Sequence, residues 1–495
     1  DENRIQVQPL APPRGLIFDR NGALLAENRP VSSLALVSER IEDTEALVAE
    51  LRSLVDIGEE DLANYHERLK RKRRPYEPVT LREVLSEAES ARLAVNRHRL
   101  PGVEVRTELK RHYPFGAVMA HAVGSVRRIN EDDLRRFDEA ENSNYSGTEF
   151  IGRRGVERFY ERSLHGEVGY QRVEINAHGR ILQVLDIEPP KSGQDITLHL
   201  DSRLQIAATA ALGERRGSVV AIDPKTGGIL ALVSNPGYDP NLFVTGISSE
   251  QYQSMVNSLQ TPLFNRAVNG QYSPGSTFKP VIGLAGISNG VISWEEEIKD
   301  YGWFKLPNQD RIYRDWSWRQ GGGGGQGIVN LNRAIYRSSN IYFYDLATRL
   351  SIEQIGSFAR QFGIGEQLAV DVADASSGLM PDPIWKQGVK GEVWYPGDNV
   401  NVGIGQGDVL VTPLQLATMT SVIANRGKVI RPRLLKPDPD GLPPIEFDPP
   451  QPLPDVMGPS PDDWERMVNS MEDVIHRGNR GFKDGFGQNG TAWAY

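Results

Sequence analysis

Cysteine is absent from all 495 residues, which excludes disulfide bonds and thiol nucleophiles. The sequence also has no run of about 18 apolar residues, so we expect no membrane-spanning helix within the chain. The eight histidines are scattered, and no pair has the spacing of metal ligands. We therefore predict neither a metal nor a cofactor.

Basic residues are outnumbered by acidic ones. Lys and Arg total 56 and Asp and Glu total 65, so the net charge is −9 and nucleic acid is not expected as a partner. One basic run, residues 68–74, reads as the end of a solvated helix rather than as a polyanion site. With 495 residues the chain has room for two or more domains of about 100–200 residues each, and its hydrophobic content of 39% is enough to form their cores.

The composition shifts at a Pro-Pro-Lys-Ser-Gly segment, and we place a domain boundary between residues 190 and 191. Before it, we expect an Asn-Gly hairpin turn at 21–22, helices at 43–55 and 81–95, and a strand at 169–175. After it, we expect a strand at 196–200, a helix from Asp201 or Ser202 to Leu212, a hairpin over 217–233 and helices at 278–287 and 462–475. This order predicts an α+β fold with an antiparallel sheet.

The segment Ser276-Thr277-Phe278-Lys279 carries the first chemical signal. A Ser-Pro-Gly turn leads into it and an apolar run follows, so Ser276 should lie near the start of a buried helix. Positions i and i+3 share a helix face, so the Lys279 amine is placed to take the Ser276 proton if burial keeps that amine neutral. Alone, this pattern fits a capping serine and a solvated lysine better, and a chain of this length holds roughly two by chance. The context reverses that interpretation, because the apolar segment after Lys279 is expected to enclose its amine and Pro274-Gly275 puts Ser276 at a sharp corner.

A Ser-x-Asn at Ser338 and Asn340 follows about sixty residues later, directly before another apolar run. A hydroxyl and an amide projected together can relay a proton and orient a substrate amide. Taken alone, the pair fits helix capping better. Its pairing with Ser276 and Lys279 is what favours catalysis. The glycine tract 321–325 reads as a flexible loop, because no Lys-Ser/Thr follows it to make a P-loop.

The two motifs together resemble those of the penicilloyl-serine transferases. Seven further segments follow in order along the chain: Arg14-Gly15, Asp19–Gly22, Gly155–Glu157, Tyr160-Glu161, Ala221–Gly227, Gly403–Gly407 and Thr412-Pro413. With them the chain resembles the class B penicillin-binding proteins over nearly its whole length. Three more segments, Arg314–Trp316, Tyr342–Tyr344 and Trp394–Gly397, resemble the elongation-specific transpeptidases within that class.

That resemblance implies an extended N-terminal α/β pedestal of dimerisation type over residues 1–190 and a transpeptidase domain with an antiparallel sheet and helices over 191–495. It implies that Ser276 attacks the D-Ala-D-Ala carbonyl of a peptidoglycan stem peptide, with Lys279 as base and with Ser338 and Asn340 moving protons and holding substrate. β-Lactams would acylate Ser276. The Ser276 N–H would supply one oxyanion donor, worth on the order of 3 kcal/mol.

The resemblance also implies a setting: the periplasmic face of the bacterial inner membrane, a single-pass anchor outside this sequence, a RodA-like glycosyltransferase and a scaffold protein of the elongation machinery. One motif departs from the family. The expected Lys-Ser/Thr-Gly does not follow Ser338, and Lys225-Thr226-Gly227 precedes the nucleophile in a turn that we read as structural. We expect the chain to stop at Tyr495 before that strand, so that catalysis requires a longer polypeptide.

Two other classes of function stay open on the sequence. A serine β-lactamase or β-lactam sensor shares Ser-x-x-Lys, but the sequence offers no clear group to activate a deacylating water, and the long N-terminal region has no role in such a protein. A non-catalytic scaffold of the same fold would explain the missing third motif but not the presence of Ser276, Lys279, Ser338 and Asn340 together. Turnover of a β-lactam would identify the first class, and failure of the serine to be acylated would identify the second.

Overall fold

The computed structural model describes residues 5–70, 78–176, 181–320, 324–372, 374–448 and 451–476. The chain divides into two compact units that are discontinuous in sequence. The first contains residues 1–216, 235–263 and 435–448, and the second contains 217–234, 264–434 and 449–495. The sequence-based boundary at residue 190 stays a prediction about domains.

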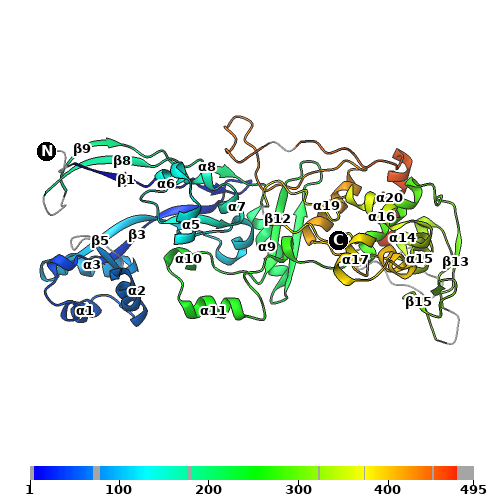
Figure 1. Ribbon diagram of the computed structural model, residues 1–495, viewed down its shortest axis with the longest axis horizontal. Coiled ribbons are helices and arrows are strands. Elements are labelled where there is room, and N and C mark those ends of the chain that lie inside the picture. The colour runs from blue at the N-terminus through cyan, green and yellow to red at the C-terminus, as the bar shows by residue number, and fades with distance from the viewer. Residues whose placement is uncertain are drawn as a thin grey trace. The chain divides into compact units, whose positions relative to one another are not determined.

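The first unit is built on the long strand β3, which pairs with β2, β4 and β5 (Figure 1). Its strands are β1 Ile5–Leu10, β2 Ile17–Phe18, β3 Leu24–Leu36, β4 Val79–Leu85, β5 Val103–His112, β6 Ser125–Arg128, β7 Phe150–Arg154, β8 Gly169–Ile175, β9 Ile181–Glu188 and β10 Ile196–Thr197. Its helices are α1 Thr44–Arg52, α2 Glu59–Leu69, α3 Glu87–Asn96, α4 Ala120–Val123, α5 Glu131–Arg136, α6 Glu139–Asn144, α7 Gly155–Phe159, α8 Glu161–His165, α9 Ser202–Leu212, α10 Leu242–Thr245 and α11 Ser249–Asn257.

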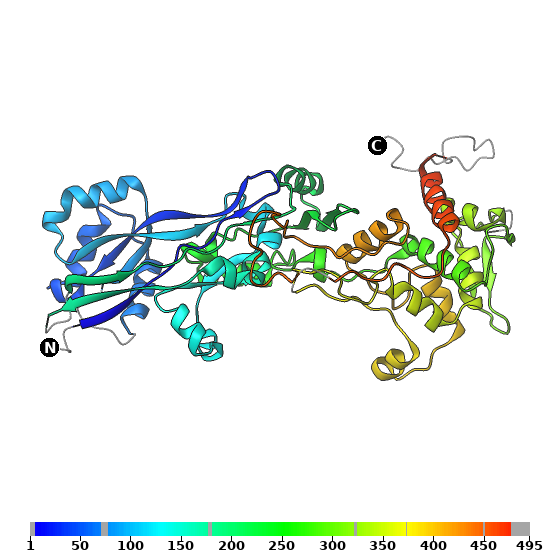
Figure 2. The ribbon, with the colours of Figure 1, turned by 90° about the horizontal axis from the view of Figure 1, so that it is seen from above.

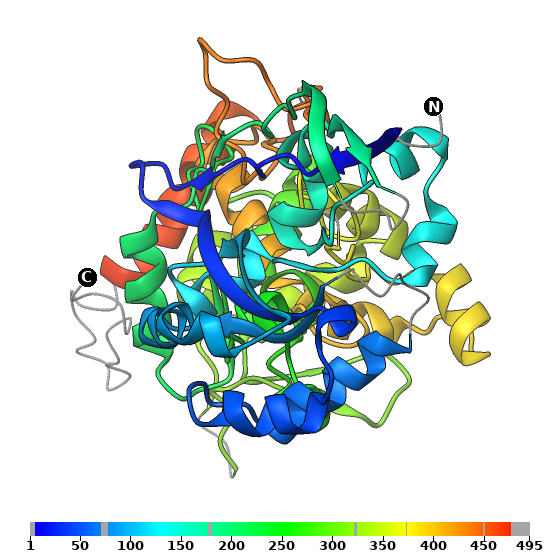
Figure 3. The same cartoon turned by 90° about the vertical axis from the view of Figure 1, so that its left-hand side faces the viewer.

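Helices α1, α2 and α3 share a hydrophobic core with β3 and β4, and Figure 2 and Figure 3 show this region from above and from one end. The predicted Asn-Gly hairpin is confirmed: Gly22 has φ +87° in the turn between β2 and β3, and Asp19 Oδ1 accepts from the N–H groups of Asn21 and Ala23. The predicted helix at 43–55 is confirmed as α1, which Asp43 caps.

The helix predicted over 81–95 is wrong in its first part. Residues Val79–Leu85 form β4, which pairs with β3 and buries Val79, Leu81 and Leu85. The helix begins only after Ser86, whose side chain accepts from Glu89 N while the Glu89 carboxylate accepts from Ser86 N. This capping box fixes the start of α3, and the tertiary pairing with β3 decides the segment before it.

A buried ion cluster connects distant parts of the first unit. The Glu157 side chain has no exposure, and its two carboxylate oxygens accept hydrogen bonds from Arg111 Nε at 2.6 Å, Arg14 Nε at 2.8 Å and the Tyr113 hydroxyl at 3.1 Å. Burial alone would raise the pKa of Glu157, but the Arg111 and Arg14 guanidinium groups hold it below its usual value. The carboxylate therefore stays charged in the interior.

Replacing Glu157 with glutamine is expected to destabilise the first unit by about 3–5 kcal/mol, because two arginines lose their buried counter-charge. Glu167→Gln is the control: Glu167 forms a 2.6 Å pair with Lys191 in which both side chains are largely exposed, so its loss should barely change stability. Urea unfolding measures both. Since folding lowers the pKa of Glu157, the contribution of this carboxylate to the free energy of unfolding should be present at neutral pH. It should be lost as acid protonates the carboxylate. Equal midpoints for the two variants would contradict the prediction.

The second unit surrounds the buried helix α13 Lys279–Ser288, which packs against helices α15, α16 and α20. Its other helices are α12 Arg266–Asn269, α14 Leu331–Tyr336, α15 Asn340–Arg349, α16 Ile352–Arg360, α17 Pro383–Lys390, α18 Pro396–Gly403, α19 Pro413–Ala424 and α20 Pro461–His476. Its strands pair as antiparallel ribbons: β11 Gly217–Ile222 with β12 Ile229–Asn235, β13 Ile298–Asp300 with β16 Gly327–Val329, and β14 Trp303–Lys305 with β15 Ile312–Arg314.

These elements confirm the predicted α+β fold, the helix from Asp201 to Leu212, the hairpin over 217–233 and the final helix. The predicted strand at 196–200 is shorter than expected and covers Ile196–Thr197. Within the described ranges, no helix is both long and apolar enough to cross a membrane.

Candidate functional site

Ser276 lies in a short 3-10 turn, Gly275–Phe278, that leads directly into α13. Its side chain is exposed, whereas the next turn is buried: Phe278 has no exposure and Lys279 is 1% exposed. Gly275 has φ +59°, a conformation that favours glycine, and its N–H donates to the Gly405 carbonyl at 2.8 Å. The turn therefore presents a reachable hydroxyl on top of a rigid helix.

The Lys279 amine lies between the two motifs. Its Nζ donates to the Ser338 carbonyl at 2.8 Å, to Ser338 Oγ at 3.0 Å and to Asn340 Oδ1 at 2.7 Å. The Phe343 ring covers it, with the amine 5.5 Å from the ring centroid. The second motif thus holds the lysine of the first.

Ser338 joins Lys279 to Ser276, because the Ser338 hydroxyl also donates to Ser276 Oγ at 2.9 Å. The i, i+3 spacing led us to expect a direct contact between Lys279 and Ser276. Among the described residues that hydrogen bond is not found. The 3-10 geometry ahead of α13 and the three acceptors on Ser338 and Asn340 direct the amine toward the second motif instead.

Burial lowers the pKa of Lys279 to about 8, although the carboxylates of Asp315 and Asp300 act to raise it. An ordinary lysine titrates near 10.4. At neutral pH about a tenth of the molecules would therefore carry a neutral amine at this position. A neutral lysine within hydrogen-bond distance of a serine hydroxyl is what base activation of a nucleophile requires.

Local structure explains the position of the Ser-x-Asn. Ser339 caps α15 by accepting from Tyr342 N at 3.3 Å, so Asn340 is the first residue of that helix. Ser338 has φ +52°, in the left-handed region that non-glycine residues rarely adopt. This conformation turns both the carbonyl and the hydroxyl of Ser338 toward Lys279. Strain of this kind tends to gather at functional sites.

All four residues predicted from the sequence are therefore brought together: Ser276, Lys279, Ser338 and Asn340. Sequence reasoning missed two buried carboxylates behind the second motif, Asp300 and Asp315. Asp315 lies in the segment Arg314–Trp316, which carries only the family resemblance, and no spacing rule connects either aspartate to Asn340. Within the described residues, no group of three His, Asp or Glu side chains is arranged to hold a metal.

Other sequence motifs lie away from these residues or outside the described ranges. Lys225-Thr226-Gly227 forms the turn between β11 and β12, where Asp223 accepts from Lys225 N at 2.9 Å and from the Thr226 hydroxyl at 2.9 Å, so the structural interpretation is confirmed. Residues 321–323 of the glycine tract and all of Gly490-Thr491-Ala492 fall outside the described residues.

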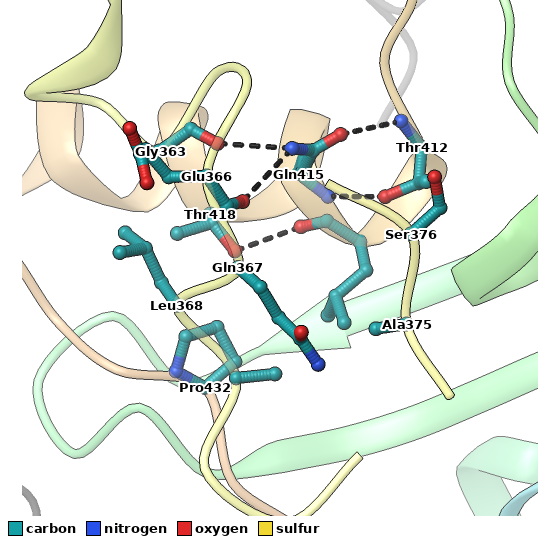
Figure 4. A pocket seen from close by; sticks show the side chains of 12 residues that line it. Gly363, Glu366, Gln367, Leu368, Ala375, Ser376, Thr412, Gln415, Thr418 and Pro432 are labelled. Carbon is teal, nitrogen blue, oxygen red and sulfur yellow. Dashed lines mark hydrogen bonds between the residues drawn. The ribbon is translucent and has the colours of Figure 1, made fainter. Parts of the chain in front are cut away.

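Gln415 of α19 is one of the residues that line a small pocket elsewhere in the second unit (Figure 4). Its Nε2 lies 3.0 Å from the Gly363 carbonyl and 2.6 Å from the Ser377 carbonyl, and its Oε1 accepts from Thr412 N at 2.9 Å. None of the four candidate residues lines this pocket. The Thr-Pro-Leu-Gln segment therefore serves the fold, because the glutamine side chain satisfies buried backbone groups.

The chain is similar to known proteins over its whole length. Residues 9–198 match the family model of the penicillin-binding protein dimerisation domain, and residues 217–491 match that of the penicillin-binding protein transpeptidase domain. A relative from Acinetobacter baumannii named peptidoglycan D,D-transpeptidase MrdA is 40% identical over 497 residues, covering 99% of this chain and 72% of the relative.

Solved structures of penicillin-binding proteins are also similar to this chain. Penicillin-binding protein 2 from Pseudomonas aeruginosa, in complex with WCK 5153, is 39% identical with a TM-score of 0.71 over 95% of this chain and 81% of that one. Penicillin-binding protein 2 from Helicobacter pylori, in complex with MreC, is 28% identical with a TM-score of 0.80 over 97% of this chain and 86% of that one. The chain therefore belongs to the class B penicillin-binding proteins, in the group of penicillin-binding protein 2.

Proposed function

We propose that this chain is a serine D,D-transpeptidase that cross-links peptidoglycan stem peptides through an acyl-enzyme on Ser276. The observation that carries the proposal is the continuous set of hydrogen bonds from Ser276 Oγ through Ser338 Oγ to Lys279 Nζ. The family of the chain and its relatives named D,D-transpeptidase support the substrate class.

The geometry favours a proton relay in the acylation step. When Lys279 is neutral, the two hydrogen bonds run in the opposite direction: Ser276 donates to Ser338 Oγ, and Ser338 donates to the Lys279 lone pair. As Ser276 Oγ attacks the carbonyl of the penultimate D-alanine, its proton passes to Ser338 and the Ser338 proton passes to Lys279. The protonated amine then supplies the proton that leaves with D-alanine.

The second half of the reaction uses the same groups in reverse. The amine of a neighbouring stem peptide attacks the acyl-Ser276 carbonyl, loses a proton to neutral Lys279 and releases the Ser276 hydroxyl. Asn340 accepts a hydrogen bond from Lys279 through its side-chain oxygen Oδ1. Its side-chain N–H₂ group can therefore donate to a substrate carbonyl. Asn340 is thus proposed to orient the stem peptide.

The proposal extends to the setting of the enzyme. We propose that it acts in cell elongation at the periplasmic face of the inner membrane, held there by an anchor. Its proposed partners are a RodA-like glycosyltransferase and a scaffold protein of the elongation machinery. The relative from Helicobacter pylori that was solved in complex with MreC supports a scaffold partner.

Intact-protein mass after incubation of the protein with a penicillin tests the proposal. We expect a persistent adduct of one β-lactam, mapped by peptide digestion to the segment with Ser276. Rapid hydrolysis of the adduct would identify a β-lactamase instead, and absence of any adduct would leave the non-catalytic scaffold.

Gly405→Ala is expected to slow this acylation by disturbing the nucleophile turn. A Cβ at residue 405 would lie 2.2 Å from the Gly275 carbonyl oxygen, so the turn before Ser276 must move. Gly290→Ala is the matched control, because Gly290 also has positive φ but has open space where a Cβ would stand. Both variants should lose about 1–2 kcal/mol of stability from the left-handed backbone, but only Gly405→Ala should acylate more slowly. Equal acylation rates for the two would contradict the prediction.

A further inference from the structure

Two buried carboxylates lie behind the Ser-x-Asn motif and take no part in the proton relay. Asp300 ends β13 and is 2% exposed, and Asp315 follows β15 and is 5% exposed. In the part of the chain that the structure describes, neither has a lysine or arginine within ion-pair distance. Burying a carboxylate without a paired cation is costly, so two such groups behind one motif call for a physical reason.

Asp315 is bound directly to the second motif. Its Oδ1 accepts from Asn340 N at 2.9 Å, at the first residue of α15. Its Oδ2 accepts from Ser317 N at 3.1 Å, the Ser317 hydroxyl at 2.5 Å and Gln326 Nε2 at 3.1 Å. These four donors immobilise the carboxylate at the first residue of α15.

Asp300 supports the neighbouring residue of the same motif. Its Oδ2 accepts from the Ser339 hydroxyl at 2.7 Å, and its Oδ1 accepts from Gly302 N at 2.7 Å. Because the Ser339 hydroxyl donates to Asp300, its lone pair is free to cap Tyr342 N. The two aspartates thus hold Ser339 and Asn340, which follow the strained Ser338.

We propose that Asp315 and Asp300 are positioning residues of the transpeptidase: they fix Ser338, Ser339 and Asn340 around Lys279 and supply negative charge to that buried amine. The inference rests on the proposed function of Ser276 and Lys279. It extends the site to two groups that touch neither the nucleophile nor the substrate position.

The electrostatics agree with this geometry. The groups that face Lys279 are the neutral Ser338, Asn340 and Phe343, and the charges that act on it are Asp315 and Asp300, both of which raise its pKa against the effect of burial. Removing either negative charge should therefore lower the Lys279 pKa. Acylation needs the neutral amine, so its rate rises with pH through that pKa, and the rise should move to lower pH in such a variant.

The test compares the pH dependence of penicillin acylation in full-length Asp315→Asn and Asp315→Glu. Asparagine removes the charge, so we expect the rise in rate to shift to lower pH. Glutamate keeps the charge but misplaces the carboxylate, so the rise should stay in place while the plateau rate falls on the order of 10- to 100-fold. Asp371→Asn is the control, since Asp371 is 1% exposed and also binds a backbone N–H, that of Leu434.

A structural role alone would reduce the amount of active protein without moving the pH dependence. The inference is overturned if the rise in rate of Asp315→Asn coincides with that of the wild type and its plateau matches that of Asp371→Asn. If Asp315→Asn does not fold, Asp300→Asn must show the same shift toward lower pH, and an unshifted profile there overturns the inference. Failure of the wild type to acylate Ser276 at any pH would instead sink the proposed function.

Discussion

Replacing Ser276 with alanine is expected to abolish covalent binding of penicillin by the full-length protein. Loss of a serine nucleophile costs on the order of 10⁶-fold in rate in a serine protease, where neighbouring groups cannot substitute for it. The same should hold here, because Ser338 stands behind Ser276 with its hydroxyl engaged by the Lys279 amine. Intact-protein mass and the rate of adduct formation measure the effect.

The control for this variant is Ser273→Ala, which removes another exposed hydroxyl three residues earlier in the same loop. It should acylate at the wild-type rate. Ser276→Ala should fold normally, since the hydroxyl is exposed and its hydrogen bond to Ser338 is worth about 1 kcal/mol. An adduct that persists in a folded Ser276→Ala protein would move the nucleophile elsewhere and reject the proposed mechanism.

The sequence was enough to predict these four residues because local rules place them. A turn of Ser-Pro-Gly fixes the entry to α13, and a capping serine fixes the start of α15. The two motifs are far apart in the sequence, and their spacing does not predict that they meet in the fold. Only the family resemblance predicted that they lie close together. The observed relay differs from the expected direct contact, because Ser338 adopts a left-handed conformation that no local pattern predicts.

Tertiary contacts decided the features that the sequence did not predict. Residues 81–85 have apolar positions that suit a helix, but β3 offers a partner strand, and pairing overrides local preference. The roles of Asp300 and Asp315 depend on which N–H groups lie opposite them after folding, which neither their neighbours nor their spacing reveals. From the sequence, an aspartate between an arginine and a tryptophan would be placed on the surface. Only the structure shows that Asp315 is buried.

Lys279→Met is expected to lower the acylation rate by about 10²- to 10⁴-fold while Ser276 remains in place. Methionine keeps most of the side-chain volume next to Phe343 but offers no base to Ser338. It also leaves the Ser338 carbonyl and Asn340 Oδ1 without their donor, so some loss of stability is expected and must be measured separately by thermal unfolding.

The matched control is Lys225→Met, which removes the exposed lysine of the chain's Lys-Thr-Gly turn and should leave acylation unchanged. The pH profile then separates chemistry from structure. Wild-type acylation should rise through about pH 8 as Lys279 loses its proton, whereas Lys279→Met should show a low rate without that rise. A variant that is merely less stable would keep the rise at reduced amplitude, and Lys279 would then hold the site together without acting as its base.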